Sequence, residues 1–296
     1  MAKSQPDQRD ATGTAIAHLG PPGTYSEQAA FFYLNWLKSN EEIEATLSPY
    51  PTIAKSLQAV ITQQADIAVV PVENSIEGSV SMTMDSLWQL DSLRIKQALV
   101  LPINHALISC ANSLDNIETV YSHPQALAQC QGWLAKFLPN ANLISSNSTT
   151  EALEQLPQAP TTAAISSSRA GELYNLPILA SGINDYPENC TRFWVVGQAS
   201  KGEELLTPTH TSLAFSVPAN VPGALVKALE VFAHLGINLS RIESRPTKRS
   251  LGEYLFFLDV EAAVNSPLME SALAELNTCT EVLKIFGSYS VLTIST

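Results

Sequence analysis

The sequence has few cysteines, and no two of them lie close together. Its four cysteines, at positions 110, 130, 190 and 279, show no Cys-x-x-Cys spacing, and its five histidines are equally dispersed over 296 residues. Zinc sites usually draw on closely spaced cysteine and histidine side chains. The sequence therefore predicts no metal site, and we expect the cysteines to be buried free thiols.

Positive charge is also scarce. The chain has 16 Lys and Arg against 28 Asp and Glu, a formal net charge of −12. Such a charge opposes non-specific binding to nucleic acid or to an anionic membrane. If the substrate is an anion, arginines and helix N-termini must create a local site for it.

Long apolar runs are absent as well. No stretch approaches the roughly 20 apolar residues that span a bilayer, and no basic start precedes an apolar secretion signal. We expect a cytoplasmic protein with neither a membrane nor a nucleic acid as partner. With 45% hydrophobic and 15% charged residues, the composition is that of a globular protein, except in the polar segment 1–13, which we expect to be a disordered leader.

A polar stretch at 199–208 separates two differently patterned regions and is predicted to be a linker. Before it, over 14–198, short β-branched runs alternate with helix-length stretches, which is typical of α/β structure. Eight predicted strands are many for one doubly wound sheet, so we expect two smaller α/β lobes facing each other across a cleft. The expected strands lie at 14–19, 66–71, 95–101, 104–110, 118–122, 142–145, 162–166 and 193–197, and the helices near 26–38, 52–63, 81–90, 124–137, 148–156 and 168–174.

After the linker the pattern changes. Residues 209–290 predict a strand, a helix, two strands, a helix and a final strand, which is the βαββαβ order of a ferredoxin-like module. This module has no hydroxyl or carboxylate cluster of its own, so we expect it to be regulatory or structural. Residues 291–296 are expected to form a C-terminal tail.

Polar side chains lie at the ends of five predicted strands, four groups directly after a strand and one, Thr191-Arg192, just before a strand; ligands of open α/β sheets bind at strand ends. Taken singly, each group has an ordinary explanation as a turn, a helix cap or a loop. Their convergence on one cleft predicts a site that binds and polarises a small polyanion. Since no Cys-His, Ser-His-Asp, Walker or G-x-G-x-x-G arrangement is present, we expect neither covalent catalysis nor a cofactor. The five groups lie at 20–30, 71–80, 121–130, 165–173 and 191–192.

Four of these segments resemble, in the same order, the motifs of prephenate dehydratases. They are GPPGTYSEQAA (20–30), PVENSIEGSV (71–80), YSHPQALAQC (121–130) and NCTRF (189–193). Region 209–290, with PGALVKAL (222–229) and IESRP (242–246), resembles the ACT regulatory domain of those enzymes. The resemblance covers nearly the whole chain after residue 13, and it is to the monofunctional form.

The resemblance implies conversion of prephenate to phenylpyruvate, water and carbon dioxide in phenylalanine biosynthesis. It also implies two lobes similar to a type II periplasmic-binding fold. Lobe 1 would comprise about 14–95 plus 178–198, and lobe 2 about 96–177.

The resemblance further implies roles for individual residues. Thr191 is the essential one, and we expect its hydroxyl to polarise the leaving ring hydroxyl by a hydrogen bond in preference to full proton transfer. Glu73 could hold the departing water or only orient its neighbours. The implied catalytic residues are Thr191, Glu73, Asn74, Ser122 and Gln129, and the implied substrate-binding residues are Thr24, Ser26, Ser75, Arg192 and Phe193.

The ACT-like module implies feedback control by phenylalanine. The effector site normally lies between the modules of two subunits, so we expect a homodimer or homotetramer. Its implied residues are Gly223, Ala224, Leu225, Glu243, Ser244, Arg245 and Pro246. Two alternatives stay open: an arogenate dehydratase, and a non-catalytic sensor of amino acids or anions.

Overall fold

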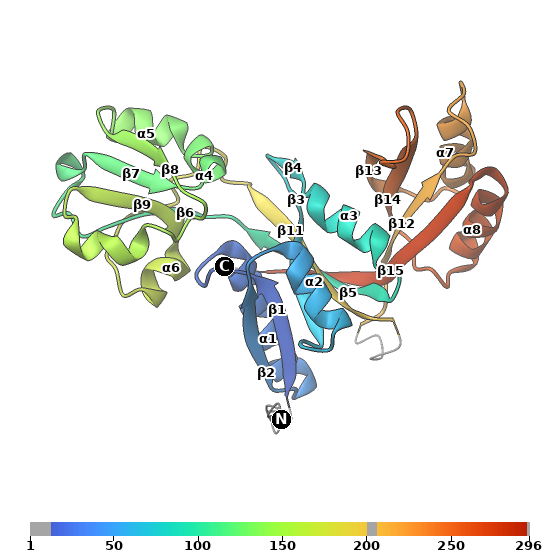
Figure 1. Ribbon diagram of the computed structural model, residues 1–296, viewed down its shortest axis with the longest axis horizontal. Coiled ribbons are helices and arrows are strands. Elements are labelled where there is room, and N and C mark those ends of the chain that lie inside the picture. The colour runs from blue at the N-terminus through green and yellow to red at the C-terminus, as the bar shows by residue number, and fades with distance from the viewer. Residues whose placement is uncertain (1–12, 200–205, 295–296) are drawn as a thin grey trace, which may run out of the picture.

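A computed structural model describes residues 13–199 and 206–294 of the chain. These residues form a central lobe, a second lobe and a C-terminal module, and the central lobe stands between the other two (Figure 1). The predicted leader, apart from Gly13, and most of the predicted linker lie outside the described residues. No helix in the described ranges is both long and apolar enough to cross a membrane.

The central lobe contains a mixed sheet with helices packed on it. Strand β1 pairs in parallel with β2 and β3, while β11 runs antiparallel between β3 and β5. Strand β2 was not predicted; it holds Pro49 and lies at the sheet edge, where a missing N–H is tolerated. The elements are β1 (Thr14–Leu19), α1 (Tyr25–Glu41), β2 (Ala45–Tyr50), α2 (Ile53–Ile61), β3 (Ile67–Asn74), β4 (Gly78–Ser79), α3 (Ser81–Gln89), β5 (Leu93–Pro102) and β11 (Cys190–Gln198).

The second lobe is built on a five-stranded sheet in the order β10-β6-β9-β7-β8. The chain enters this lobe after β5 ends at Pro102 and leaves it after β10 ends at Ser181, later than the predicted crossings near 95 and 178. The entry is late because β5 stays paired with β11 over its full length, and the exit is late because β10 pairs with β6. The elements are β6 (His105–Ser109), η1 (Leu114–Asn116), β7 (Thr119–Ser122), α4 (Pro124–Ala128), α5 (Gln131–Phe137), β8 (Asn142–Ser145), η2 (Leu153–Gln158), β9 (Thr162–Ser167), α6 (Ser168–Leu173) and β10 (Ile178–Ser181).

The C-terminal module has the predicted βαββαβ order, so the predicted fold class of two α/β lobes followed by a ferredoxin-like module is confirmed. Its four strands lie in the order β13-β14-β12-β15. The elements are β12 (His210–Ser216), α7 (Ala224–His234), β13 (Leu239–Pro246), β14 (Tyr254–Val260), α8 (Pro267–Cys279) and β15 (Val282–Thr293).

Strand β15 joins the module to the central lobe. Its first part pairs with β12, and Ser290–Thr293 then pair in parallel with β5. The prediction of a tail from 291 is therefore wrong for residues 291–293, because they complete a sheet that runs through both bodies. Figure 1 shows this long strand extending from the module toward the central lobe.

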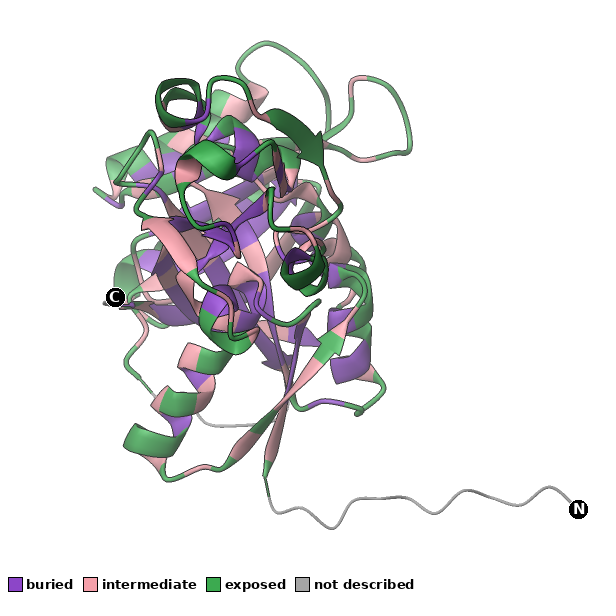
Figure 2. Ribbon diagram, turned by 90° about the vertical axis from the view of Figure 1, so that its left-hand side faces the viewer, coloured by how far each residue is buried: buried purple, intermediate pink, exposed green. Residues whose placement is uncertain are grey.

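The core follows the sheets. Two buried apolar clusters in the central lobe draw on residues of its sheet and of its helices. Figure 2 shows buried segments in the interior of the molecule and exposed ones on its outer helices. Trp194 of β11 and Tyr289 of β15 are each 1% exposed, and their rings lie 6.5 Å apart in an edge contact. Burial of such aromatic surface between two bodies favours a fixed arrangement of the central lobe and the module.

Candidate active site

A cavity of about 390 Å³ lies between the two lobes, at the carboxyl ends of β1 and β3. This is the edge at which ligands of open α/β sheets bind. Both lobes contribute to its wall. The lining residues are Leu19, Tyr25, Ser26, Ile53, Pro71, Asn74, Glu77, Gly78, Ser79, Val80, Ile103, His105, His123, Gln125, Ala126, Gln129, Thr149, Thr191 and Phe193.

Thr191 and Asn74 meet in this wall because they are cross-strand partners on β11 and β3. The Asn74 Nδ2 donates to the Thr191 Oγ1 at 2.9 Å. In the described part of the chain the Thr191 hydroxyl donates to no protein partner, so its hydrogen is available to a ligand in the cavity. The amide also makes the hydroxyl a better donor, because an oxygen that accepts a hydrogen bond polarises its own O–H.

A chain of amides leads from Asn74 into the second lobe. The Asn74 Nδ2 also donates to the Asn189 Oδ1 at 2.8 Å, and the Asn189 Nδ2 donates to the Gln129 Oε1 at 2.8 Å. Asn189 and Gln129 are buried, being 2% and 5% exposed. A predicted site residue of the second lobe, Gln129, is thus connected to Thr191 by direct hydrogen bonds.

Sequence reasoning missed Asn189, His105 and Tyr25. The His105 Nε2 lies 3.0 Å from the Gln129 Oε1, and its Nδ1 lies 2.9 Å from the Tyr25 hydroxyl. These partners are 24 and 80 residues apart in the sequence. No local motif signals such a contact, whereas Asn189 stands two residues before Thr191 inside a recognised motif.

The structure places five of the ten predicted catalytic and substrate-binding residues in the cavity wall: Ser26, Asn74, Gln129, Thr191 and Phe193. The other five are Thr24, Glu73, Ser75, Ser122 and Arg192, and none of them lines it.

Three of the five outside the wall have hydroxyl groups that contact the backbone. Thr24 caps α1, accepting from the Glu27 backbone N–H and donating to the Pro21 carbonyl. The Ser122 hydroxyl is buried and donates to the Ile165 carbonyl of β9 at 2.6 Å. Ser75 accepts from the Cys190 N–H at 3.0 Å. Their hydroxyls stabilise the elements around the site.

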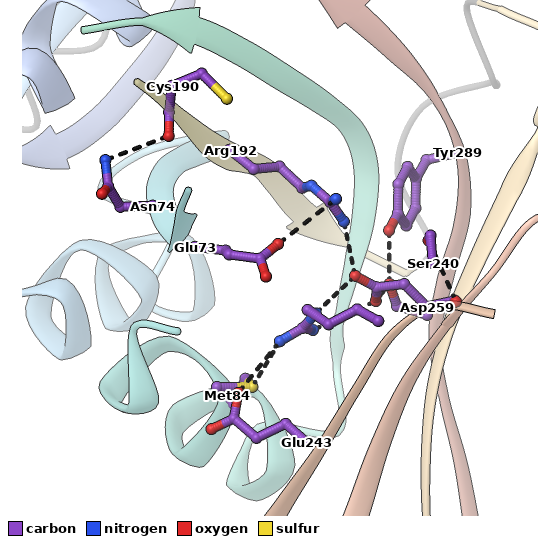
Figure 3. A network of polar contacts seen from close by, with 11 residues as sticks. Glu73, Asn74, Met84, Cys190, Arg192, Ser240, Glu243, Asp259 and Tyr289 are labelled. Carbon is purple, nitrogen blue, oxygen red and sulfur yellow. Dashed lines mark hydrogen bonds and ion pairs between the residues drawn. The ribbon is translucent and has the colours of Figure 1, made fainter. Parts of the chain in front are cut away.

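Arg192 and Glu73 face away from the cavity. Successive side chains of a strand point to opposite faces, so Thr191 and Arg192 cannot both reach one cavity. The Arg192 Nη1 instead donates to Asp259 of β14 at 2.9 Å, and Glu73 lies 3.5 Å from the Arg192 Nη2. Figure 3 shows both side chains turned toward Asp259, while Asn74 reaches in another direction. In this structure Arg192, which the resemblance implies to be a substrate-binding residue, therefore pairs with acidic side chains and does not line the cavity.

The cavity wall contains no Lys or Arg among the described lining residues. Burial lowers the pKa of both His105 and His123, which favours their neutral forms. An anion in this cavity would thus be met by neutral donors and by the N-terminus of α1, a helix of 17 residues with Ser26 in its first turn.

Helix α3 connects the cavity wall to the C-terminal module. The segment before it, residues 77–80, which contains β4, lines the cavity. On the helix itself, Asp85 lies 3.1 Å from the Arg245 Nη2 of β13, and the Lys284 Nζ of β15 donates to the Leu87 carbonyl at 2.9 Å. A displacement of the module would therefore move a helix that begins at the cavity.

The predicted effector residues divide between two places. Gly223 precedes α7 with φ +83° and open space where a Cβ would lie, and Ala224 and Leu225 open that helix. On β13, Glu243 lies 3.6 Å from the Arg241 guanidinium. Arg245, as noted, faces α3, whereas Ser244 and Pro246 are exposed.

Comparisons with known proteins agree with this architecture. The family model described as prephenate dehydratase matches residues 16–201, and the model of the ACT domain matches residues 211–277. The bifunctional chorismate mutase/prephenate dehydratase of Aquifex aeolicus is 42% identical over 277 residues, with 93% of this chain and 73% of the relative covered. The prephenate dehydratase of Lactococcus lactis subsp. cremoris is 38% identical over 283 residues, with 93% of this chain and 97% of the relative covered.

A solved structure is similar over the same extent. The crystal structure of the prephenate dehydratase of Arthrobacter aurescens in complex with L-Phe is 34% identical and superposes with a TM-score of 0.83, covering 93% of this chain and 90% of that one. The predicted resemblance is confirmed in both parts, the catalytic region and the ACT module. The chain therefore belongs to the prephenate dehydratase family.

Proposed function

We propose that this chain is a prephenate dehydratase in which Thr191 assists departure of the ring hydroxyl. The observation that supports the assignment of Thr191 is the hydrogen bond from the Asn74 amide to its Oγ1 at 2.9 Å, at the wall of the interlobe cavity. Because Oγ1 accepts in that contact and donates to no described protein group, its hydrogen is available to a ligand in the cavity.

The reaction needs little from the protein. The bond between the ring and its carboxylate breaks, its electron pair enters the ring, and the hydroxyl on the opposite carbon leaves as the ring becomes aromatic. The carboxylate leaves as carbon dioxide, a hydrogen bond from Thr191 stabilises the charge that develops on the departing oxygen, and a proton taken up from solvent converts that oxygen to water. Preorganised donors of this kind contribute about 10²–10³-fold.

The substrate is a dianion, and neutral groups would hold it. We assign its carboxylates to the N-terminus of α1 near Ser26 and to the donors of the opposite wall, including Gln129. Helix N-termini bind anions through free N–H groups and the helix dipole. Phe193, 1% exposed, supplies an apolar surface beside Thr191.

L-Phenylalanine is the proposed effector, as in the solved relative whose complex contains it. We assign it to the start of α7 at Gly223–Leu225 and to the neighbouring end of β13 at Glu243–Pro246. A change in the module on phenylalanine binding would be transmitted to the active site by two routes. One leads through Arg245 and its ion pair with α3, and the other through Asp259, which contacts the arginine next to Thr191. We also propose self-association through the modules as a homodimer or homotetramer, and a cytoplasmic location, for which four free cysteines are typical.

The test is phenylpyruvate formation by the purified chain from prephenate and, separately, from arogenate, each with and without L-phenylalanine. We expect prephenate turnover that phenylalanine suppresses. Turnover of neither compound would contradict the proposed function and favour a sensor.

Arogenate is the competing substrate, and one feature of the wall bears on it. Arogenate carries an ammonium group that calls for an acceptor, and Glu77 rather than Glu73 lines the cavity. A Glu77→Gln variant should lower arogenate turnover selectively if that compound is used, and it should affect prephenate turnover less.

A further inference from the structure

Tyr25 and His105 form a pair across the two lobes, next to Gln129 in the cavity wall. Tyr25 belongs to α1 of the central lobe, and His105 opens β6 of the second lobe. The His105 ring is 2% exposed and lies edge-on to the Tyr25 ring, with centroids 5.4 Å apart. The mechanism proposed above uses neither side chain, although the pair continues the amide chain that ends at Thr191.

Two backbone groups fix the direction of that chain. The N–H groups of Ile76 and Glu77 each lie 3.0 Å from one amide atom of Asn74. Because an N–H group can only donate, that atom is the carbonyl oxygen, and the Asn74 NH₂ must face Thr191 and Asn189. The Asn189 atom facing Asn74 is then its oxygen, so the Asn189 NH₂ faces Gln129.

The Gln129 amide sets the tautomer of His105. The Gln129 atom that receives the Asn189 NH₂ is its carbonyl oxygen, and this oxygen also faces the His105 Nε2 at 3.0 Å. The Nε2 must therefore carry a hydrogen. In a neutral imidazole the Nδ1 then has a lone pair, which accepts the Tyr25 hydroxyl hydrogen across 2.9 Å. The Tyr25 hydroxyl also lies 2.9 Å from the Asn104 carbonyl, a second acceptor for its hydrogen.

A reversed Gln129 amide would disrupt the sequence of donors and acceptors from Asn74 to Gln129. The Gln129 NH₂ would then face the Asn189 NH₂, so that two donors met. If Asn189 also reversed to avoid this, its NH₂ would face the Asn74 NH₂, and the same conflict would arise there. The His105 Nε2–H opposes that reversal, since it favours an oxygen at the shared position, and the Glu77 carboxylate opposes it from the other side, since it accepts from the Gln129 Nε2 at 3.4 Å. The imidazole is thus the shorter of two contacts that hold the last member of a chain whose first member donates to Thr191.

We propose that His105, oriented by Tyr25, is a positioning residue for dehydration at Thr191: its Nε2–H keeps the Gln129 amide in the orientation that Asn189 and Asn74 require. This inference rests on the proposed function. It assigns to His105 no contact with substrate and no proton transfer.

Two matched amide substitutions test the proposal. The side-chain nitrogen of a glutamine can reach the place of the His105 Nε2, whereas that of an asparagine reaches only as far as the Nδ1. His105→Gln should keep kcat within about threefold of the parent, and His105→Asn should lower kcat about tenfold, the size of one net hydrogen bond. The KM for prephenate should change little in both. Equal losses of kcat in the two variants, or no loss in either, would overturn the proposal.

The tautomer itself gives a readout that does not depend on activity. In the ¹⁵N NMR spectrum, the imidazole signals of His105 are those of the unsubstituted protein that disappear in His105→Gln. Their chemical shifts should be those of a ring with a hydrogen on Nε2 and a lone pair on Nδ1. Tyr25→Phe should increase the share of the Nδ1–H form. Hydrogen on Nδ1 alone in the parent would contradict the proposal even if the variants failed to fold. Absence of prephenate turnover in the parent would instead contradict the proposed function and leave the tautomer assignment standing.

Discussion

The buried imidazoles of His18 and His105 make the stability of this fold depend on pH. They are 1% and 2% exposed, and burial lowers the pKa of both from the usual 6.5. The unfolded chain therefore binds more protons than the folded one as the pH falls below this value. Stability contributed by the neutral rings is present above pH 6.5 and is lost as the pH falls toward the lowered pKa values.

We predict that the free energy of unfolding decreases between pH 7.5 and pH 5.5, about one unit on either side of the histidine value. His105→Gln should decrease less over that interval, because the glutamine keeps the donor and removes the titrating group. Urea denaturation at several pH values measures the slopes. Equal slopes for the parent and the variant would contradict the burial argument.

At the residue scale, sequence motifs predicted residues that share one cavity wall, but they did not give the direction of each side chain. Thr191 and Asn74 were predicted together, and the strand pairing brings them into contact. Arg192 was predicted to bind substrate beside Thr191, but it lies outside the cavity wall, because adjacent strand residues face opposite sides. The predicted strand began only at residue 193, so the sequence pattern offered no reason to separate the two side chains. His105 could not be found, since its partners come from distant segments.

At the scale of elements, β15 is the strand that depends most on a single glycine. A Cβ on Gly287 would stand 2.9 Å from the Ile95 backbone nitrogen of β5 and closer still to its carbonyl oxygen. Backbone atoms of a central strand cannot move aside cheaply, so the glycine permits β15 to pass from the module's sheet to that of the central lobe.

We predict that Gly287→Ala costs about 3 kcal/mol of stability through overpacking. Gly197→Ala on β11 is the matched control, because its Cβ would meet only side-chain atoms, at 3.3 to 3.6 Å. Urea denaturation of both variants gives the comparison. A loss in Gly287→Ala no larger than in the control would show that β15 does not require this close approach.

Helices and strands were predicted well where the sequence pattern that specifies them lies within the element itself. The βαββαβ order of the module was correct, whereas the predicted helix 124–137 is two helices, α4 and α5, with a break at Gln129 and Cys130. The first amides of α5 donate to Asp185, more than 50 residues away: Gly132 N–H at 2.8 Å and Trp133 N–H at 3.0 Å. A helix that is capped by a residue so distant in the sequence has no capping residue next to its first turn, so the start of α5 could not be predicted.

At the scale of the whole molecule, Asp259 links the regulatory module to the catalytic strands. It is fully buried, and its carboxylate accepts from Arg192 of β11 at 2.9 Å, from Arg241 of β13 at 2.8 Å and from the Ser212 hydroxyl at 2.6 Å. Removal of one partner from a buried ionic cluster leaves charge uncompensated. A carboxylate in the module thereby holds the residue next to Thr191.

Asp259→Asn should therefore cost about 3 kcal/mol of stability, within the range for breaking a buried pair. It should also weaken the response of turnover to phenylalanine, since one contact between the module and β11 is lost. Arg249→Gln, which removes exposed ion pairs of the same module, should cost less than about 1 kcal/mol. Thermal unfolding and inhibition curves for both variants measure these effects, and an unchanged phenylalanine response in Asp259→Asn would exclude this route.

The measurement that tests the account most directly separates binding from turnover at Thr191. Thr191→Ala should bind prephenate within several-fold of the parent, as titration calorimetry would show, while kcat falls about 10²–10⁴-fold; Thr191→Ser, which keeps the hydroxyl, should fall far less. Equal losses of binding and turnover in Thr191→Ala, or full activity without the hydroxyl, would contradict the claim that Thr191 donates to the departing hydroxyl.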